Sequence, residues 1–524
     1  MTKQLDLYDI QGNVCKGYGR YGFPKARYCF LHFNAMSSAQ EFLLKLITLI
    51  TTAETWPVSD DSDKHLIKPN STLNVGFTYA GLGALGLPET SLKGFPVDFT
   101  MGMKSRADLL GDTGVSAPEN WDEIWQGPAV HAWVAINGRD QDAIENQYSE
   151  LEERVSEHSE GVQILAGIKG PHGSNLSYQD ASAVFENGVP TAKEHFGFTD
   201  GIGNPYFEGC GHSLSRLPGR GKLMRDGSWQ ALATGEFVLG HIDEAQEYPP
   251  APEPKLLARN GTYMVFRKLH ENVDTFNDYI DGLVDDYAGS RDMLMAKMSG
   301  RWPDNGAPLI LAANDDEKSA LDAKMANLEL RIKEGDQSAI EERKLMRSKW
   351  TNFTFDADAD GGRCPIGAHI RRTHTRGFLE TEKGAFSRPG ALVDRRRLMR
   401  RGLPYGGIDE AISDSAEQGI IFMSIGASIE RQFEFVQQQW VNYSNDFKLG
   451  NDKDPLIGSH QGQLIDKHII QSCPVAHGDT NQPVKPPFFC TQMPRFVETR
   501  GGDYFFIPSI TALRMIAQGL IDPS

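Results

Sequence analysis

Apolar residues recur along this chain in four short runs, and each run is followed by a segment with helical spacing. The runs are rich in β-branched and aromatic residues, which favour strands. Ser, Asp and Asn recur at the turns, where helices are expected to begin. This rhythm predicts β-α-β-type units. The strand–helix pairs are 28–35 with 37–50, 129–136 with 139–157, 262–269 with 271–284, and 419–428 with 429–440.

The four units form two widely separated pairs, and 524 residues are too many for a single core. We therefore predict two related α+β domains, each a largely antiparallel sheet with helices on one face. A proline-rich segment, 247–254, follows a glycine-rich one, so the junction is expected between 205 and 255. The charged stretch 315–349 predicts a helical surface insertion.

Composition narrows the classes of function. A hydrophobic content of 40% and an aromatic content of 10% are typical of a folded protein. A net charge of -17 argues against nucleic-acid binding, although local basic clusters such as 395–401 could be exceptions. No apolar run is long enough to predict a membrane span. The N-terminus shows neither an apolar signal core nor twin arginines, so a cytoplasmic location is expected.

The six cysteines are scattered and include no C-x-x-C pair. This spacing argues against a zinc ribbon and against covalent attachment of a c-type haem. The prediction is free, buried thiols in a reducing compartment.

The segment FGFTDGIGNP, 196–205, places a lone carboxylate, Asp200, among glycines. Glycines allow backbone geometry closed to other residues and a close approach to a flat ligand. The spacing fits neither a P-loop nor a dinucleotide fingerprint. An Asx turn and a ligand-facing acid both remain open for Asp200.

Two further segments combine histidine or arginine with tight turns. His369 lies in GGRCPIGAHIRRTHTRG, 361–377, and the arginines after it could meet anionic groups such as propionates. That combination suits an axial haem ligand, although a lone histidine is more often structural. The segment RRRLMRRGLPYGG, 395–407, allows two interpretations: a basic stretch on the surface, or an arginine held in a pocket.

Together these motifs resemble those of one family, the dye-decolorising peroxidases, which are haem enzymes. The resemblance covers most of the chain, in five motifs in the right order. It implies two ferredoxin-like domains that resemble a dimeric α+β barrel, here 1–215 and 216–524. The motifs are YDIQGNVCKGYG (8–19), FGFTDG (196–201), RCPIGAHIRRTHTR (363–376), MRRGLPYG (399–406) and GGDYFFIPSITALRMIAQG (501–519).

The resemblance assigns roles residue by residue. His369 is implied as the axial ligand of the haem iron. Asp200 is implied as the distal acid and base, and Arg400 as the residue that stabilises charge when the O–O bond breaks, with Arg401 as the fallback. Arg376 is implied to bind a haem propionate.

The same loop would pack against the cofactor. Gly201 is expected to let it lie close to the haem, and Phe198 to supply apolar contact. His374 stands where many relatives carry Asn, which leaves the hydrogen bonding at the haem edge open.

An axial histidine normally donates its second ring N–H to an acceptor. The predicted helix 429–440 offers Glu430 and Glu434, one turn apart, although helix-surface glutamates are usually solvated. Between them we favour Glu434 as the partner of His369.

The resemblance implies a peroxidase with one non-covalent haem b per chain. It would reduce hydrogen peroxide and oxidise dyes and phenolic compounds in one-electron steps. We expect an acidic working pH range, because an aspartate is ionised at lower pH than a distal histidine is neutral. The partners are peroxide and an organic electron donor, with no nucleic acid and no membrane, and a homodimer is left open. The alternatives are a non-catalytic haem-binding or haem-handling protein, a relative of chlorite dismutase, and an interaction protein without metal.

Overall fold

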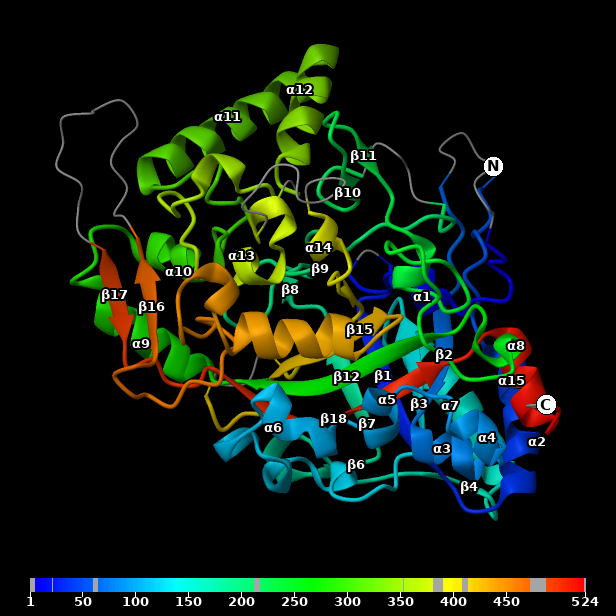
Figure 1. Cartoon of the computed structure of the whole chain (residues 1–524). Helices are drawn as coiled ribbons and strands as arrows, with labels where there is room; N and C mark the ends of the chain where they lie inside the picture. Colours follow the sequence, from blue (N-terminus) through cyan, green and yellow to red (C-terminus); the bar gives the residue numbers. More distant parts are fainter. Residues whose placement is uncertain are drawn as a thin grey trace.

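One antiparallel sheet organises the structure (Figure 1). The computed structural model describes residues 5–20, 22–59, 65–211, 217–351, 353–379, 390–407, 413–471 and 487–522. Within these ranges, ten strands follow the order β13-β15-β12-β18-β2-β3-β1-β4, with β14 beside β15 and β7 beside β1. Their bounds are β1 Lys25–Phe33, β2 Ser71–Phe77, β3 Ala132–Gly138, β4 Val162–Ile164, β7 Tyr178–Ser182, β12 Thr262–Glu271, β13 Met399–Arg400, β14 Leu403–Tyr405, β15 Gly419–Gly426 and β18 Val497–Ile507.

The sheet has two halves, joined where Phe506 of β18 pairs with Phe77 of β2. Strands from the first part of the chain form one half, and those from Thr262 onward form the other. This arrangement confirms the predicted α+β class with antiparallel sheets, whereas the domain limits 1–215 and 216–524 stay a prediction. The longer helices are α2 Met36–Leu46, α7 Gln141–Glu157, α9 Val273–Val284, α10 Arg291–Ser299, α11 Asp315–Lys333, α12 Gln337–Ser348 and α15 Ile510–Ala517.

Shorter elements connect and cover these layers. The short helices are α1 Gly12–Cys15, α3 Tyr79–Ala84, α4 Glu89–Leu92, α5 Val97–Met101, α6 Ala107–Leu110, α8 Lys255–Ala258, α13 His369–Thr373 and α14 Ala391–Asp394. Small two-stranded sheets pair β5 Ile168–Lys169 with β6 Asn175–Leu176, β8 Phe185–Glu186 with β9 Val189–Pro190, β10 Lys222–Leu223 with β11 Trp229–Gln230, and β16 Lys467–Ile470 with β17 Phe488–Thr491.

The strand–helix units follow from local sequence. After β3, Asp140 accepts a hydrogen bond from the backbone N–H of Ala143 at 2.9 Å and so caps α7. One apolar face of α7 then packs inward at helical spacing. Its buried residues are Ala143, Ile144, Tyr148, Leu151 and Val155.

The charged stretch 315–349, expected to be helical, contains two helices, α11 and α12, which pack against each other. They lie at the top of Figure 1, away from the central sheet. Asn314 caps α11 through the backbone N–H of Glu317, and the Glu317 carboxylate accepts from the N–H of Ala313. These bonds resemble a capping box, with the N–H of Ala313, one residue before the N-cap, as the donor to Glu317.

The segment 429–440 is helical but not α-helical. Two π-helical stretches, Glu430–Glu434 and Val436–Val441, replace the regular turn. The wider turn changes which side chains share a face, and this matters for the glutamates discussed below. The apolar residues of the segment are nevertheless buried as predicted, namely Ile429, Phe433, Val436 and Trp440.

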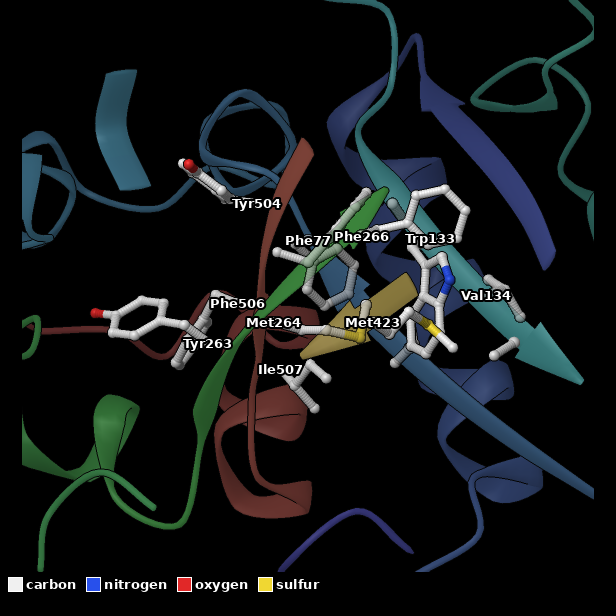
Figure 2. Close-up of a cluster of buried hydrophobic side chains, with 14 of the residues drawn as sticks. Phe77, Trp133, Val134, Tyr263, Met264, Phe266, Met423, Tyr504, Phe506 and Ile507 are labelled. Carbon is white, nitrogen blue, oxygen red and sulfur yellow. The ribbon is translucent and has the colours of Figure 1, made fainter. Parts of the chain in front are cut away.

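The core lies where the two halves of the sheet meet (Figure 2). Phe77 and Trp133 come from the first half, and Met264, Phe266 and Met423 come from the second. All five side chains are buried. Because full burial of one such side chain contributes about 1.5–3 kcal/mol, this shared core stabilises the joint between the halves.

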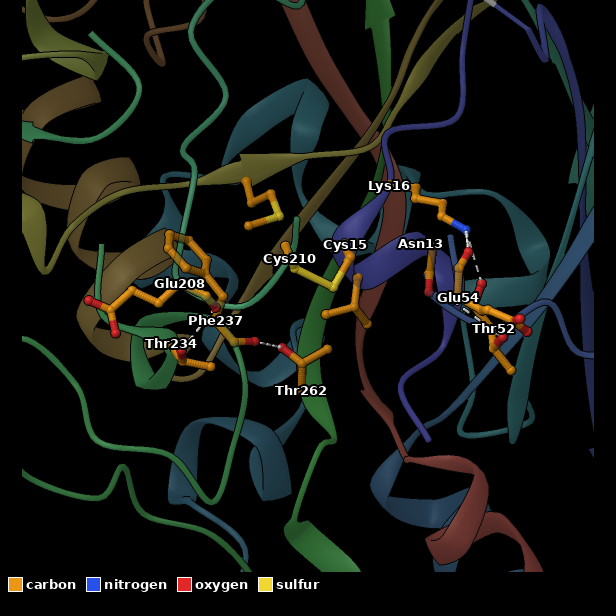
Figure 3. The surroundings of a disulfide bond; sticks show 12 residues. Asn13, Cys15, Lys16, Thr52, Glu54, Glu208, Cys210, Thr234, Phe237 and Thr262 are labelled. Atoms are coloured by element: carbon orange, nitrogen blue, oxygen red, sulfur yellow. Dashed lines mark hydrogen bonds between the residues drawn. A yellow bond between two sulfur atoms is a disulfide. The ribbon is translucent and has the colours of Figure 1, made fainter. Parts of the chain in front are cut away.

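The cysteine prediction is wrong for two of the six residues. Cys15 of α1 forms a disulfide with Cys210, 195 residues further along the chain, with the two Cα atoms 5.7 Å apart (Figure 3). Spacing gave no warning of this bond, because the two cysteines are brought together only by the fold. The free buried thiols are Cys29, Cys364 and Cys490, and Cys473 lies outside the described residues.

Across the described ranges, no helix has both the length and the apolar character needed to cross a membrane. The cytoplasmic location stays a prediction.

Candidate active site

A large cavity lies beside the second half of the sheet, with an empty volume of about 1730 Å³ that includes its open mouth. Several elements distant in sequence line it, including the loop around Asp200, strands β12 and β15, helix α13 and the π-helical segment. Much of its wall is apolar. The apolar lining includes Phe196, Phe198, Ile202, Leu269, Ile370, Phe422, Phe433, Val436, Val441, Leu456 and Ile457.

The loop that carries Asp200 is a tight hairpin. Lys193 and Thr199 form an antiparallel bridge, and the backbone N–H of Asp200 donates to Ala192 O at 2.8 Å. Gly201 follows with φ of +76°, a conformation that glycine adopts without strain. The hairpin thus presents the Asp200 side chain, 47% exposed, to the cavity.

Arg400 is the ionic partner of Asp200. Its Nη1 donates to Asp200 Oδ1, and its Nη2 donates to Ile202 O at 3.2 Å. Strand β13 fixes its backbone, where the Arg400 N–H donates to Asn204 Oδ1 at 3.1 Å. The predicted acid and arginine therefore meet although they lie 200 positions apart.

Two opposing effects act on the pKa of Asp200. Burial raises it, while the positive charge of Arg400 and hydrogen bonds from Gly201 N–H and Arg400 lower it by more. The net pKa lies below that of an ordinary aspartate, so Asp200 rests as a carboxylate that can accept a proton.

Arg401, the alternative candidate for the distal arginine, does not pair with Asp200. Its guanidinium donates to the carbonyl oxygens of Asn13 and Val14 near the N-terminus. Neighbouring residues in an extended segment point in opposite directions, and this separates the two arginines.

His369 begins helix α13, and its ring lines the same cavity. Its Nδ1 lies 2.9 Å from Asp454 Oδ2. Burial lowers the pKa of the imidazole, but the Asp454 carboxylate raises it by more, and the net pKa lies above the usual value. In return, His369 helps to lower the pKa of the buried Asp454 to about 2, against the raising effect of burial. An ionised Asp454 that holds Nδ1–H leaves Nε2 for a ligand.

The prediction of Glu434 as the partner of His369 is wrong. The Glu434 carboxylate is buried in an ion pair with Arg106 and accepts a hydrogen bond from the Tyr504 hydroxyl at 2.8 Å. The π-helical turns direct it there, and it does not line the cavity.

The sequence does not identify Asp454 as a site residue, because its only local signature is an Asp-Pro turn. Its Oδ1 accepts from the backbone N–H groups of Leu456 and Ile457, as an Asx-type turn would. Nothing in that pattern points to a histidine 85 residues away.

Of the arginines after His369, one lines the cavity. Arg376 is buried in its wall and donates to Gly219 O at 2.7 Å. The other two are structural, which corrects the expectation that all three could meet an anionic ligand. Arg371 pairs with Asp358, and Arg372 donates to Gly367 O and Trp440 O.

His374 also lines the cavity, stacked on Phe353 with ring centroids 4.6 Å apart. Burial, followed by the positive charges of Arg376 and other arginines, holds the pKa of His374 well below its usual value, so its ring is neutral. Gly203 packs against the same Phe353.

These residues fit a haem. One imidazole has its Nδ1 fixed by a carboxylate, an acid–arginine pair lies on another element, and the walls between them are largely apolar. Phe198, predicted beside the cofactor, lines the cavity, whereas Gly201 lines a second cavity that shares Asp200 and Arg400.

Known proteins show the same architecture over nearly the whole chain. The family model described as "DyP dimeric alpha+beta barrel domain" matches residues 9–170. "Peroxidase 2" of Mycetinis scorodonius is 29% identical, with 97% of this chain and 87% of that protein covered. "Multifunctional dye peroxidase DyP2" of Amycolatopsis sp. is 27% identical, with 97% and 96% covered.

Solved structures agree. A fungal DyP-type peroxidase from Auricularia auricula-judae superposes with a TM-score of 0.69 at 24% identity, covering 98% of this chain and 100% of the other. An ancestral D-type dye decolorizing peroxidase gives 0.68 at 25% identity, with 98% and 99% covered. Residues 9–170 thus match the DyP domain model, and nearly the whole chain is similar in sequence and fold to DyP-type peroxidases.

Proposed function

We propose that this DyP-type peroxidase binds one haem b non-covalently per chain, reduces hydrogen peroxide and oxidises organic donors such as dyes and phenolic compounds in one-electron steps. The observation that carries the proposal is that Asp200, Arg400 and His369 line one cavity. Asp200 pairs with Arg400, and His369 pairs with Asp454.

His369 Nε2 would hold the iron, and Arg376 would lie within reach of a propionate. When bound, the haem supplies an iron centre that takes electrons from the donor and passes them to peroxide. Asp454 keeps a proton on Nδ1 of His369 and makes the ring a stronger donor.

Asp200 performs the proton transfer. As a carboxylate it accepts a proton from one peroxide oxygen and delivers it to the other oxygen, which leaves as water. Arg400 stabilises the negative charge that develops while the O–O bond breaks. Phe196 and Phe198, neighbours of the acid in the chain, are buried and contribute apolar surface to the cavity wall.

The partners required are hydrogen peroxide and an organic electron donor. A homodimer and a cytoplasmic location stay predictions. A protein that only carries haem would need His369 and Asp454 but not the Asp200–Arg400 pair, and that pair favours the enzyme.

The test is to purify the protein with haem supplied and to mix it with peroxide and a phenolic donor. We expect a Soret band, its rapid change on mixing, and donor oxidation. His369→Ala should lose the haem, while Arg400→Leu should keep it and lose most donor oxidation. Haem that is only slowly bleached, with Arg400→Leu behaving like wild type, would favour the haem-handling alternative.

A further inference from the structure

Two buried glutamates share the cavity with Asp200. Glu194 is 8% exposed and Glu271 is 3% exposed, and both line the cavity. Neither has an arginine or lysine partner among the ion pairs of the described residues. Burial of a carboxyl group without a cation strongly disfavours its ionised form.

The hairpin geometry places Glu194 beside Asp200. The bridge between Lys193 and Thr199 sets the register, and the Glu194 N–H donates to Phe198 O at 3.1 Å. Side chains alternate between faces along each arm, so Glu194 and Asp200 lie diagonally on one face. Diagonal neighbours are roughly 7–8 Å apart at Cα, within reach of two carboxyl side chains.

Glu271 approaches from the sheet. It ends β12, where the alternation that points Arg267 and Leu269 into the cavity also points Glu271 there. Its Oε2 is buried and has no hydrogen-bond donor among the described residues. The carboxyl group of Glu271 interacts directly with that of Glu194.

The two members of the pair are not equivalent. Glu194 Oε1 and Oε2 accept from the backbone N–H groups of Phe198 at 2.6 Å and Phe196 at 2.9 Å. Burial raises the pKa of Glu194 to about 7 against these bonds. Burial, followed by the charge of Glu194, raises the pKa of Glu271 well above its usual value. Glu271 therefore holds its proton while Glu194 exchanges one near neutral pH.

Asp200 is coupled to both acids. Its negative charge raises the pKa of Glu194 and of Glu271. The other groups that act on the pair are the backbone N–H of His195 and the neutral hydroxyl of Tyr405 on β14. Arg400 and Arg267 face the same cavity, but their ion pairs are with Asp200 and Asp112 and not with either glutamate.

We propose that Glu194 and Glu271 form a proton-sharing carboxyl pair that supplies protons to Asp200 while peroxide is reduced, an inference that rests on the proposed function. The balance is H2O2 + 2 e⁻ + 2 H⁺ → 2 H2O. The O–O bond breaks and two O–H bonds form; the organic donor supplies the electrons, and solvent supplies the protons.

One member of the pair, Glu194, also lines a second cavity. Asp200 and Arg400 line the same cavity, whose wall carries Arg20 and Lys68. Both Glu194 and Asp200 are open to protons from this side, and Glu194 replaces the proton that Asp200 gives up. The pair acts through Asp200 and not on peroxide itself.

The first test measures protonation without turnover. Infrared spectra of the holoprotein, titrated without peroxide, should contain a protonated-carboxyl band that persists at neutral pH. Glu271→Gln should remove that band, and Asp200→Asn should move the midpoint of Glu194 to lower pH. Asp503→Asn is the matched control, because Asp503 is a half-buried acid with a pKa raised by burial to about 6 that lines neither cavity.

The second test measures the proton-consuming reaction. Turnover with a dye donor should fall about tenfold above pH 7 in Glu271→Gln, less than the 10²–10⁴-fold that direct acid–base catalysis contributes. Glu271→Asp should restore it, and Asp503→Asn should leave it unchanged. If Glu271→Gln does not fold, the same turnover measurement is made on Glu194→Gln, which removes the other acid of the pair.

The inference is overturned if Glu271→Gln removes no carboxyl band, if Asp200→Asn leaves the Glu194 midpoint in place, or if both pair variants keep the wild-type pH profile. Failure of the proposed function would differ, because wild type would then neither bind haem nor react rapidly with peroxide, whatever the infrared bands show.

Discussion

At the scale of single residues, the chemistry depends on which acid meets which base. Asp454 forms a hydrogen bond with Nδ1 of His369. Glu434, the partner predicted from the sequence, instead forms an ion pair with Arg106 and a hydrogen bond with Tyr504. Both acids are buried, and only their partners distinguish them. Substitution separates their roles directly.

Asp454→Asn should weaken haem affinity by about 10–100-fold, the usual cost of losing the group that orients a metal-bound histidine. It should also raise the reduction potential, because the imidazole becomes a poorer donor. Titration with haem and spectroelectrochemistry measure the two effects.

Glu434→Gln is the control. It should lower the free energy of unfolding by about 1–3 kcal/mol through the Arg106 pair and leave the potential unchanged. If instead Glu434→Gln shifts the potential and Asp454→Asn does not, the assignment of the histidine partner is wrong.

A second prediction at this scale concerns pH. The net pKa of Asp200 is lowered, so the peroxide reaction should be fast above that pKa and slow as pH falls through it. Arg400→Leu removes a lowering influence, and the acid limb of the rate profile should move to higher pH. Arg400→Lys keeps the charge and should keep the limb near its wild-type position. An acid limb that is the same in all three proteins would contradict this prediction.

At the scale of elements, the hairpin at 192–203 was expected only as a tight glycine-rich loop around Asp200. Its glycines, its acid and its flanking phenylalanines are neighbours in the chain, so local rules for turns suffice. The groups that meet the hairpin, Glu271 and Arg400, come from distant strands; the family resemblance named Arg400, and no local pattern named Glu271.

Two glycines of this element should respond differently to substitution. A Cβ at Gly203 would lie 2.4 Å from Phe353 Cε2, whereas one at Gly201 meets nothing within 4 Å. Both have positive φ, so Gly201→Ala should cost about 1–2 kcal/mol in unfolding free energy through backbone strain alone.

Gly203→Ala should cost more and should also weaken haem binding, because Phe353 supports His374 at the cavity wall. Chemical denaturation and haem titration of the two variants test this. Equal losses in both would show that the contact with Phe353 does not constrain the loop.

At the scale of the whole molecule, one sheet and one disulfide join distant parts of the chain. The rhythm of strands and helices was enough to predict the α+β class, because alternation and helical spacing are local properties. It could not predict that the halves share a sheet at Phe77 and Phe506, nor that Cys15 meets Cys210, because both contacts depend on tertiary packing.

The disulfide should stabilise the fold. It closes a loop of 195 residues, and removal of a native disulfide typically costs about 2–5 kcal/mol. Cys15→Ser and reduction of the wild type should lower the unfolding midpoint by similar amounts, and Cys29→Ser should not reproduce the effect of reduction. A wild type whose midpoint does not change under reductant, with two free thiols found at Cys15 and Cys210, would contradict the prediction.

The central claim is that Asp200 moves the proton that breaks the O–O bond of peroxide. The most direct measurement is the single-turnover rate of the haem-loaded protein with hydrogen peroxide, wild type against Asp200→Asn, in a stopped-flow spectrometer. We expect the rate in Asp200→Asn to be about 10²–10⁴-fold lower than in wild type, with the haem still bound. A rate in Asp200→Asn equal to that of wild type would contradict it.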